Sequence, residues 1–374
     1  MVKRGLVTDR PLSAVVLAAG EGTRMRSSLT KPLHRLCGRP MVLHVLDALV
    51  GLEVERAVVV VGHAAEQVTK TLHEQGPPSL LIEFVEQHVQ RGTGDAVSVA
   101  LTVFPDDDVD DGGDIVILPG DTPLLRPATL AALVRAHRRA DAAATILTAR
   151  LADPTGYGRI LRSRDDRVSR IVEQADATDE ERQITEINTG IYCFRRSVLA
   201  PALRRLSPEN AQGEYYLTDI IQVLHVAGYP VTSVVVDDPI DVGGVNDRAQ
   251  LAVAESGLRE RINRRWMRRG VTMLDPARTY IDVGVELAPD VTLLPGVVLQ
   301  GHTVVATGAE LGPNTQLIDC SVGEGATVIN TFGRSAEIGA NALVGPWATL
   351  EPGARVAPGT VTGPCFTGSS DDDG

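Results

Sequence analysis

The amino-acid sequence predicts an α/β fold in two parts: a Rossmann-like, mostly parallel sheet, followed by a short left-handed parallel β-helix. Short β-branched runs alternate with helical patterns over residues 12–250, an order typical of a parallel sheet covered by helices. From Leu287 onwards an aliphatic residue recurs every six positions. Aromatic residues are scarce, with 5 Phe, 2 Trp and 6 Tyr among 374 residues. The core is therefore expected to be aliphatic, which suits parallel strands and repeats.

The first part of the chain contains the strand–helix alternation. Strands are predicted at SAVVLAAG (13–20), RAVVVVG (56–62), LLIEFVEQ (80–87), DIVILPGD (114–121), AATILTARL (143–151), TGIYCF (189–194) and VTSVVVDD (231–238). Residues 41–52 and 129–140 have apolar side chains at three- and four-residue spacing, which predicts helices. In such sheets ligands bind beyond the carboxyl ends of the strands, so residues there are the first candidates for a site.

One helix is predicted at residues 251–270, where it links the two parts. Gly270 is placed to close this helix at the C′ position, and Arg residues crowd its last turns, where the helix dipole favours cations. The predicted domains are therefore residues 1–250, a linker helix at 251–270, and the β-helix.

Beyond the linker the sequence changes to a sixfold repeat over residues 271–362. The aliphatic positions are Leu287, Leu293, Leu299, Val305, Leu311, Leu317, Val322, Val328, Ile338, Val344, Leu350 and Val356. A period of six fits neither a helix nor a simple strand, and it indicates hexapeptide repeats with about three hexads to a coil. About twelve hexads predict about four coils, enough for stability if the ends are capped. The acidic end, residues 363–374, is predicted to be disordered.

Composition and charge exclude several classes of protein. A formal charge of −12 disfavours a dedicated nucleic-acid binder, which would show a basic face. The four Cys residues lie far apart, against a zinc knuckle or a disulfide framework. No apolar run approaches the length of a membrane span. We therefore expect a cytoplasmic protein with neither nucleic acid nor membrane as partner.

The first predicted strand leads into the loop Leu17–Met25, of sequence LAAGEGTRM. Glycine permits a tight bend, and successive backbone N–H groups can form a nest for anionic oxygens. Arg24 adds a guanidinium fork for phosphate and Lys31 a second positive charge. Taken alone, a G-x-G is more often a tight strand-to-helix turn with surface basic residues. The Walker pattern is absent and Met25 replaces the third glycine of a dinucleotide fingerprint, so NAD binding is disfavoured.

Asp121 follows the buried run DIVILPG, so its carboxylate is expected at the carboxyl end of a strand. A metal ligand belongs at this edge of the sheet. The alternative role for an Asp after a Gly is that of a turn former or helix cap.

Taken together, the order of motifs resembles the sugar-1-phosphate nucleotidyltransferases. The blocks that carry the resemblance are LAAGEGTRM, TKPL, Gln87, RGTGDA (91–96), LPGDTPL (118–124), DPTGYGRI (153–160), IVE (171–173), INTGI (187–191), NAQGEYYLTD (210–219) and GVNDR (244–248). Within that family they are similar to the uridyltransferase part of the bifunctional bacterial enzymes that make UDP-N-acetylglucosamine. The resemblance spans about residues 13–360 and implies the nucleotide-diphospho-sugar transferase fold.

The resemblance implies a reaction and a cofactor. N-acetylglucosamine 1-phosphate would attack the α-phosphorus of UTP, and pyrophosphate would leave. A phosphate monoester has a second pKa near 6, so the nucleophile is largely ionised without a general base. The reaction then needs positioning and charge neutralisation by basic side chains and a divalent ion, here Mg²⁺. Magnesium takes carboxylate and carbonyl oxygens and keeps several waters, so one or two protein ligands suffice.

Roles for individual residues follow from the resemblance. Arg24 and Lys31 would be catalytic, and Asp121 and Asn246 would bind the metal. The nucleotide is assigned to Leu17, Ala18, Ala19, Gly20, Gly22, Thr23, Gln87, Gly92 and Thr93. The sugar is assigned to Gly158, Glu173 and Asn188, with Tyr215 and Thr218 as further candidates.

The sequence departs from the family pattern in its β-helix. The bifunctional relatives carry an Arg that binds the amino-sugar phosphate, where this sequence has Glu351, whose charge would repel a phosphate. The family's acetyltransferase His has no counterpart here, so no acetyl transfer is predicted. In the first domain Pro119 and Arg91 replace the residues often found there, and neither change removes a proposed ligand.

Other functions stay open on sequence grounds. The same reaction could use a different sugar 1-phosphate or triphosphate. A catalytically silent nucleotide-sugar-binding protein is a second alternative, against which Arg24, Lys31, Asp121 and Asn246 speak. The β-helix could assemble as a homotrimer, as hexapeptide coils of the family do, or stay monomeric.

Overall fold

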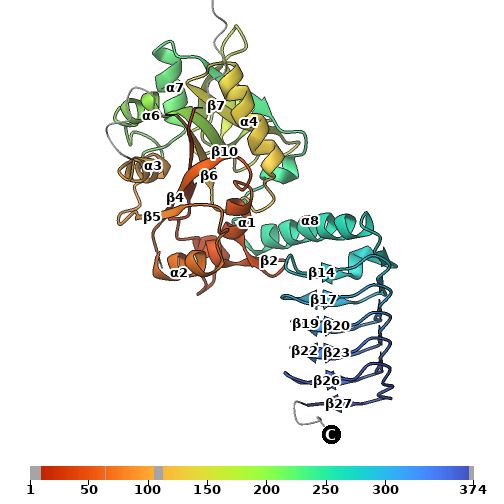
Figure 1. Cartoon of the computed structure of the whole chain (residues 1–374). Helices are drawn as coiled ribbons and strands as arrows, with labels where there is room; N and C mark the ends of the chain where they lie inside the picture. The colour runs from red at the N-terminus through yellow and green to blue at the C-terminus, as the bar shows by residue number, and fades with distance from the viewer. Residues whose placement is uncertain (1–9, 64, 105–112, 370–374) are drawn as a thin grey trace, which may run out of the picture. The chain divides into compact units, whose positions relative to one another are not determined.

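The computed structural model describes residues 10–63, 65–104 and 113–369. The chain divides into two compact units, residues 1–34 with 40–254, and residues 35–39 with 255–374. Figure 1 shows the first as a sheet with helices and the second as a stack of short strands. Helix α8 (Arg248–Met267) contributes residues to both units, because the division falls after Ala254.

The first unit is built on a nine-stranded sheet in the order β11-β7-β10-β6-β1-β4-β5, in which β8 pairs with β10, and β9 pairs with β8. The strands are β1 (Leu12–Leu17), β4 (Val54–Val61), β5 (Ile82–Glu86), β6 (Asp114–Pro119), β7 (Ala144–Arg150), β8 (Arg159–Arg162), β9 (Val168–Val172), β10 (Glu186–Arg195) and β11 (Val231–Val235). All seven predicted strands are present, and β1 runs parallel to both β4 and β6. Strand β10 is antiparallel to β6 and β7. The predicted mostly parallel α/β sheet is confirmed.

Helices cover both faces of this sheet. They are α1 (Met41–Asp47), α2 (Ala65–Gln75), α3 (Thr93–Leu101), α4 (Pro127–Arg139), α5 (Asp179–Arg182), α6 (Arg196–Leu203) and α7 (Asp219–Val226). Side chains of α1, α2 and α4 pack in one apolar cluster with Ala14 and Val16 of β1. Side chains of α3, α6 and α7 pack in the other, with Val15. Alternate residues of β1 are thus buried on opposite faces, which explains its continuous apolar sequence.

The second unit is a three-walled stack of parallel strands. One wall contains β12 (Thr272–Met273), β15 (Thr292–Leu293), β18 (Glu310–Leu311), β21 (Thr327–Val328) and β24 (Leu343–Val344). The second contains β13 (Tyr280–Ile281), β16 (Val298–Gln300), β19 (Gln316–Ile318), β22 (Phe332–Arg334), β25 (Thr349–Leu350) and β27 (Thr367–Gly368). The third contains β14 (Glu286–Leu287), β17 (Val304–Val305), β20 (Ser321–Val322), β23 (Glu337–Ile338) and β26 (Arg355–Val356). The predicted β-helix is confirmed.

The sixfold aliphatic positions form the interior of this β-helix. Leu293, Leu299, Leu311 and Leu317 have no exposed surface. Leu299 pairs with Leu317, whereas Val305 pairs with Val322. The coil is therefore one residue shorter at Val322, which is the slip seen in the sequence.

The β-helix begins at Thr272–Met273, close to its predicted start at residue 271, and extends past its predicted end at residue 362. Met273 pairs with Leu293 of the next coil, and a short helix, η5 (Pro276–Arg278), interrupts the sixfold spacing in between. The prediction that residues 363–374 are disordered is wrong for its first part. Residues 367–368 form β27, which pairs with β25 through Thr349 and Leu350. The backbone there is ordered by the coil beneath it, whatever the polarity of its side chains. Residues 370–374 lie outside the described part.

The segment Arg35–Arg39 belongs to the second unit although it lies early in the chain. The backbone N–H of Cys37 donates to Glu255 at 2.8 Å, and its carbonyl accepts from the N–H of Val283 at 3.0 Å. The sequence does not predict this exchange, because nothing in five residues indicates a distant partner. All four cysteines are free, and burial raises the pKa of the Cys37 thiol.

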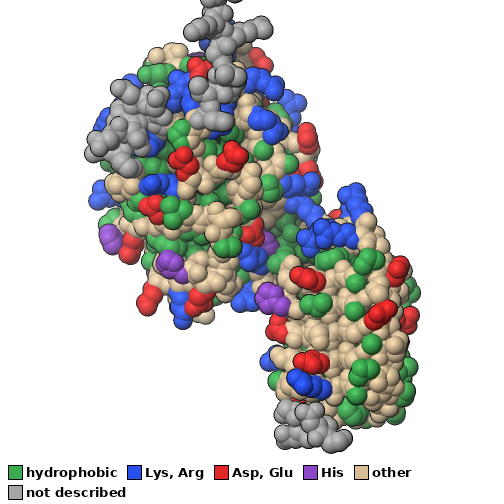
Figure 2. Space-filling model, viewed as in Figure 1, with side chains coloured by type: hydrophobic (Ala, Val, Ile, Leu, Met, Phe, Trp, Pro, Cys, Tyr) green, Lys and Arg blue, Asp and Glu red, His purple; other side chains and the backbone are tan. Residues whose placement is uncertain are grey.

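Charged side chains occur on both units. Figure 2 shows basic and acidic side chains interspersed over the visible face of the first unit, and further charged side chains on the visible face of the second. Among the described helices, none combines the length and the apolar character that crossing a bilayer requires.

Candidate active site

The loop after β1 has the geometry of a close turn against Lys31. Gly22 has a φ of 64°, and a Cβ atom built there would lie 2.5 Å from Cβ of Lys31. The N–H of Met25 donates to the carbonyl of Gly22 at 2.9 Å and starts the short helix η1 (Thr23–Met25). Position 22 therefore requires glycine for two reasons. Its positive φ disfavours other residues, and any side chain there would push Lys31 away.

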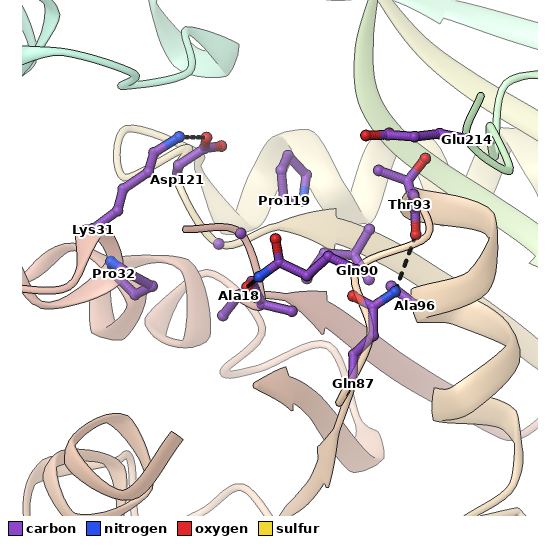
Figure 3. Close-up of a pocket in the computed structure, with 15 residues that line it drawn as sticks. Ala18, Lys31, Pro32, Gln87, Gln90, Thr93, Ala96, Pro119, Asp121 and Glu214 are labelled. Carbon is purple, nitrogen blue, oxygen red and sulfur yellow. Dashed lines mark hydrogen bonds and ion pairs between the residues drawn. The ribbon is translucent and has the colours of Figure 1, made fainter. Parts of the chain in front are cut away.

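A pocket of about 320 Å³ lies at the carboxyl ends of β1, β5 and β6. Leu17 pairs with Pro119 across β1 and β6, so the loops that follow these strands lie side by side. The lining residues are Leu17, Ala18, Ala19, Gly20, Lys31, Pro32, Gln87, Gln90, Gly92, Thr93, Ala96, Pro119, Gly120, Asp121 and Glu214. Figure 3 shows Lys31 and Asp121 at one side, and Thr93 and Glu214 at the other. Most of the predicted nucleotide residues line this pocket, whereas Gly22 and Thr23 lie on the turn behind it.

Four of the predicted residues meet at one edge of the pocket. The Lys31 ammonium contacts the Asp121 carboxylate (Figure 3) and donates to Oδ1 of Asn246 at 2.9 Å. The guanidinium of Arg24 donates to the same Oδ1 at 3.0 Å. The N–H of Val245 donates to the carbonyl of Asp121 at 2.8 Å, which holds the loop of Asn246 against the loop of Asp121.

The oxygen atoms of Asp121 and Asn246 are arranged as ligands for a divalent ion would be. Oδ2 of Asp121 and Oδ1 of Asn246 share a single cationic atom, Nζ of Lys31, so the two oxygens already converge on one point. No group of three or more His, Cys, Asp or Glu side chains with metal-site geometry occurs in the described residues. Two oxygen donors with free space beside them suit a hard ion that keeps several of its waters. The donor set therefore fits magnesium better than zinc, which takes His and Cys ligands.

One side of the pocket is lined by two glutamine amides. Gln87 is buried, and its Nε2 donates to Asp95 at 2.8 Å and to the carbonyl of Gly92 at 3.2 Å. Gln90 donates to the carbonyl of Ala19 at 2.6 Å. Because Nε2 of Gln87 is already engaged, its Oε1 is the atom free to accept from a ligand. Sequence reasoning missed Gln90, although an amide three residues after Gln87 and beside the Gly92 loop is a detectable signal.

The loop of Gly92 and Thr93 is tied to the segment around Tyr215. The N–H of Gly94 donates to the carbonyl of Tyr215 at 2.7 Å, and the N–H of Tyr215 donates to that of Arg91 at 2.8 Å. Oγ1 of Thr93 accepts from the N–H of Leu217 at 3.0 Å. Glu214, which sequence reasoning also missed, lines the pocket from this segment.

Four of the predicted sugar residues, Gly158, Glu173, Asn188 and Thr218, form a second cluster, whereas Tyr215 makes its backbone bonds to Gly94 and Arg91. Thr218 donates to Glu173 at 3.2 Å. A Cβ atom on Gly158 would lie 3.3 Å from Oε2 of Glu173 and 3.5 Å from Cβ of Asn188. Burial raises the pKa of Glu173, and the charge of Asp219 adds to this. The cluster can therefore offer a carboxyl group, an amide and an open backbone to a polar ligand.

Comparison with known proteins agrees with this geometry. Residues 13–255 match the family described as nucleotidyl transferase. A "Bifunctional protein GlmU" from Desulfitobacterium hafniense is 47% identical over 336 residues, which cover 90% of this chain and 72% of that protein. A protein of the same name from Mycolicibacterium vanbaalenii is 48% identical over 339 residues, covering 90% of this chain and 68% of that one. One from Thermobifida fusca is 48% identical over 297 residues, covering 79% and 61%.

The chain thus spans between 61% and 72% of the length of these three relatives. The matched family covers the sheet unit that holds both clusters described above. The chain is a nucleotidyltransferase, and it belongs to the nucleotidyl transferase family and, within it, to the GlmU group of proteins.

Proposed function

We propose that this chain transfers the uridylyl group of UTP to N-acetylglucosamine 1-phosphate, with Mg²⁺, to give UDP-N-acetylglucosamine and pyrophosphate. The observation that carries the proposal is the convergence of Asp121 and Asn246 oxygens on one cationic atom beside Arg24. A reaction between two phosphates needs such a point, because the anions must be brought together against their repulsion.

The chain's own residues supply the rest of the chemistry. The sugar phosphate is already ionised, so no side chain has to remove a proton. Lys31 and Arg24 would move from Asp121 and Asn246 onto the triphosphate, where they stabilise the charge on the α-phosphorus oxygens. Asp121 and Asn246 would hold Mg²⁺, which neutralises the approaching oxygens.

Two clusters support the assignment of the substrates. The free Oε1 of Gln87 and the backbone of Ala19 and Gly20 match the hydrogen-bonding edge of a uracil. Gly158, Glu173 and Asn188 match the hydroxyl and acetamido groups of the sugar. UTP as the donor, together with four free cysteines, fits a cytoplasmic location.

We further propose that the chain lacks acetyltransferase activity. Glu351 is exposed, and its backbone N–H donates to Gly368 at 3.0 Å, so its side chain stands at the surface of the β-helix. A carboxylate at this position repels a phosphate where the relatives attract one. Incubation with acetyl-coenzyme A and glucosamine 1-phosphate is expected to release no coenzyme A.

We propose a homotrimer through the β-helix, which sedimentation velocity distinguishes from a monomer.

Pyrophosphate release tests the proposed reaction directly. The assay compares UTP, dTTP and ATP as donors, and N-acetylglucosamine, glucosamine and glucose 1-phosphates as acceptors, each with Mg²⁺ and with a chelator. We expect the highest kcat/KM for UTP with N-acetylglucosamine 1-phosphate, and no turnover in chelator. A preference for glucose 1-phosphate contradicts the proposed acceptor, and turnover in chelator contradicts the proposed metal.

A further inference from the structure

Strand β10 contains a bulge directly after Asn188. On the neighbouring strand β7, Thr148 is opposite Asn188 and Ile146 is opposite Tyr192. Four positions of β10 therefore match two positions of β7, so β10 carries two extra residues here. Bulges next to a site commonly re-aim a side chain.

The bulge is held by specific contacts of its own residues. Gly190 has a φ of 77°, a conformation that favours glycine. The hydroxyl of Thr189 donates to the carbonyl of Leu147 at 2.7 Å and accepts from the N–H of Ile191 at 3.3 Å. This backbone path is therefore a fixed feature of the strand.

The bulge brings together two side chains that a regular strand would separate. Residues four apart in a strand are about 13 Å apart, since each adds about 3.3 Å. Here Nδ2 of Asn188 donates to the phenol oxygen of Tyr192 at 2.7 Å. On the other side, the N–H of Gly190 donates to Oδ1 of Asn188 at 3.1 Å. Both ends of the Asn188 amide are thus fixed.

We propose that Tyr192 is a positioning residue for the acceptor sugar, because its phenol oxygen fixes the amide of Asn188 beside Gly158 and Glu173. This inference rests on the proposed function. With one N–H engaged by Tyr192 and one lone pair by Gly190, Asn188 retains one N–H and one lone pair for the ligand. An acetamido sugar offers the complementary acceptor and donor.

The phenol oxygen is suited to this role because it stays neutral. Tyr192 is 2% exposed, and burial together with the charge of Glu173 raises its pKa. The ring itself packs in the apolar cluster and lies 5.5 Å from the ring of Phe194. Phenylalanine would fill the same space, so the hydroxyl can be removed without removing the packing.

Steady-state kinetics of Tyr192→Phe test this inference. We expect the KM for the sugar phosphate to rise about three- to tenfold, as for one lost hydrogen bond, with the KM for UTP unchanged. Tyr229→Phe is the matched control, because it deletes the hydroxyl of a tyrosine that is 45% exposed. In an Asn188→Ala background, Tyr192→Phe should have no further effect on this KM, since the phenol acts through the amide.

Three outcomes overturn the inference: an unchanged KM for the sugar phosphate, an equal rise in both KM values, or additive effects with Asn188→Ala. If Tyr192→Phe does not fold, Thr189→Val replaces it. That variant removes the bond that holds the bulge and should give the same selective rise, while an unchanged KM again overturns the inference. Failure of the proposed function is distinguishable, because it appears as absent turnover in the unaltered protein. If that protein prefers another sugar 1-phosphate, the same variants are compared with that sugar.

Discussion

Lys31 and Asp121 are in direct contact, and Asn246 accepts from the same ammonium. The lysine thus holds the point on which the two proposed metal ligands converge. A cation that binds there must first separate Lys31 from both oxygens. The triphosphate offers Lys31 an alternative partner, so nucleotide and metal are expected to bind cooperatively.

Removing this lysine should therefore tighten metal binding to the nucleotide-free protein. For Lys31→Met we expect the affinity for Mn²⁺ to rise about tenfold, since a charge-assisted contact of ~1–2 kcal/mol no longer competes. Electron paramagnetic resonance of free Mn²⁺ measures this without any turnover. Lys70→Met, at an exposed helical position, is the control. Equal affinities for unaltered protein and Lys31→Met contradict the competition.

The carboxylate of Asp121 should be indispensable for turnover. Asp121→Asn keeps the shape but removes the charge, and we expect kcat/KM to fall about a thousandfold, because metal stabilisation of several kcal/mol is lost. Pyrophosphate release measures the rate, and circular dichroism checks the fold. Full activity of Asp121→Asn would contradict the proposed role of Asp121 as a metal ligand that turnover requires. Asp153→Asn, at an exposed position, should leave the rate nearly unchanged.

Glu173 should lower the stability of the folded protein, although we propose that it binds the sugar. Burial raises its pKa, so the folded protein binds this proton more tightly than the unfolded chain does. Above that pKa the ionised group therefore opposes folding, and the penalty disappears as the pH falls below it. We expect Glu173→Gln to raise the melting temperature at pH 7 by about 2–4 °C, and to weaken sugar-phosphate binding.

The pH dependence provides the check on Glu173. The difference in melting temperature should shrink as the pH is lowered through the raised pKa of Glu173, because the carboxyl of the unaltered protein then takes up its proton. A difference that does not change with pH would show that the carboxyl does not titrate differently in the folded state. Gln can still accept from Thr218, so that hydrogen bond is retained in the comparison.

Asp114 should stabilise the fold. It begins β6, at the end of the strand that is opposite to the pocket. Burial opposes its ionisation, but the approach of His137 at 3.4 Å, a hydrogen bond from Arg138 at 2.9 Å and the charge of Arg10 outweigh this and lower its pKa. The stabilisation is therefore present above the ordinary carboxyl pKa and is lost as the pH falls through the lowered value. We expect Asp114→Asn to cost about 3–5 kcal/mol at pH 7, as for a broken buried ion pair.

Urea unfolding measures this effect of Asp114. Asp165→Asn is the control, because Asp165 pairs with Arg167 at the surface, where both side chains are more than half exposed, and should change stability by less than about 1 kcal/mol. Since Asp114 begins β6 and the pocket lies beyond its end, the folded variant should keep its KM values. A loss of acid sensitivity in Asp114→Asn is also expected.

The sequence alone determined the sheet, the β-helix and the candidates for the nucleotide site. The reason is local: β-branched runs, sixfold aliphatic spacing and the glycine at position 22 each act through short-range geometry or burial. The family resemblance added Asn246 and the sugar residues, which no spacing would have connected to Asp121.

Only the tertiary structure decided where these groups point and what they contact. Three contacts depend on segments that the sheet brings together. They are the ion pair of Lys31 with Asp121, the hydrogen bond from Gln90 to the carbonyl of Ala19, and the hydrogen bond from Asn188 to the phenol oxygen of Tyr192. The order of β27 was likewise missed, because its polar sequence resembles a tail while its backbone bonds to a coil already formed. Hydrogen-bond partners far apart in the chain are chosen by the tertiary arrangement of the loops, and such single contacts leave no periodic pattern in the sequence.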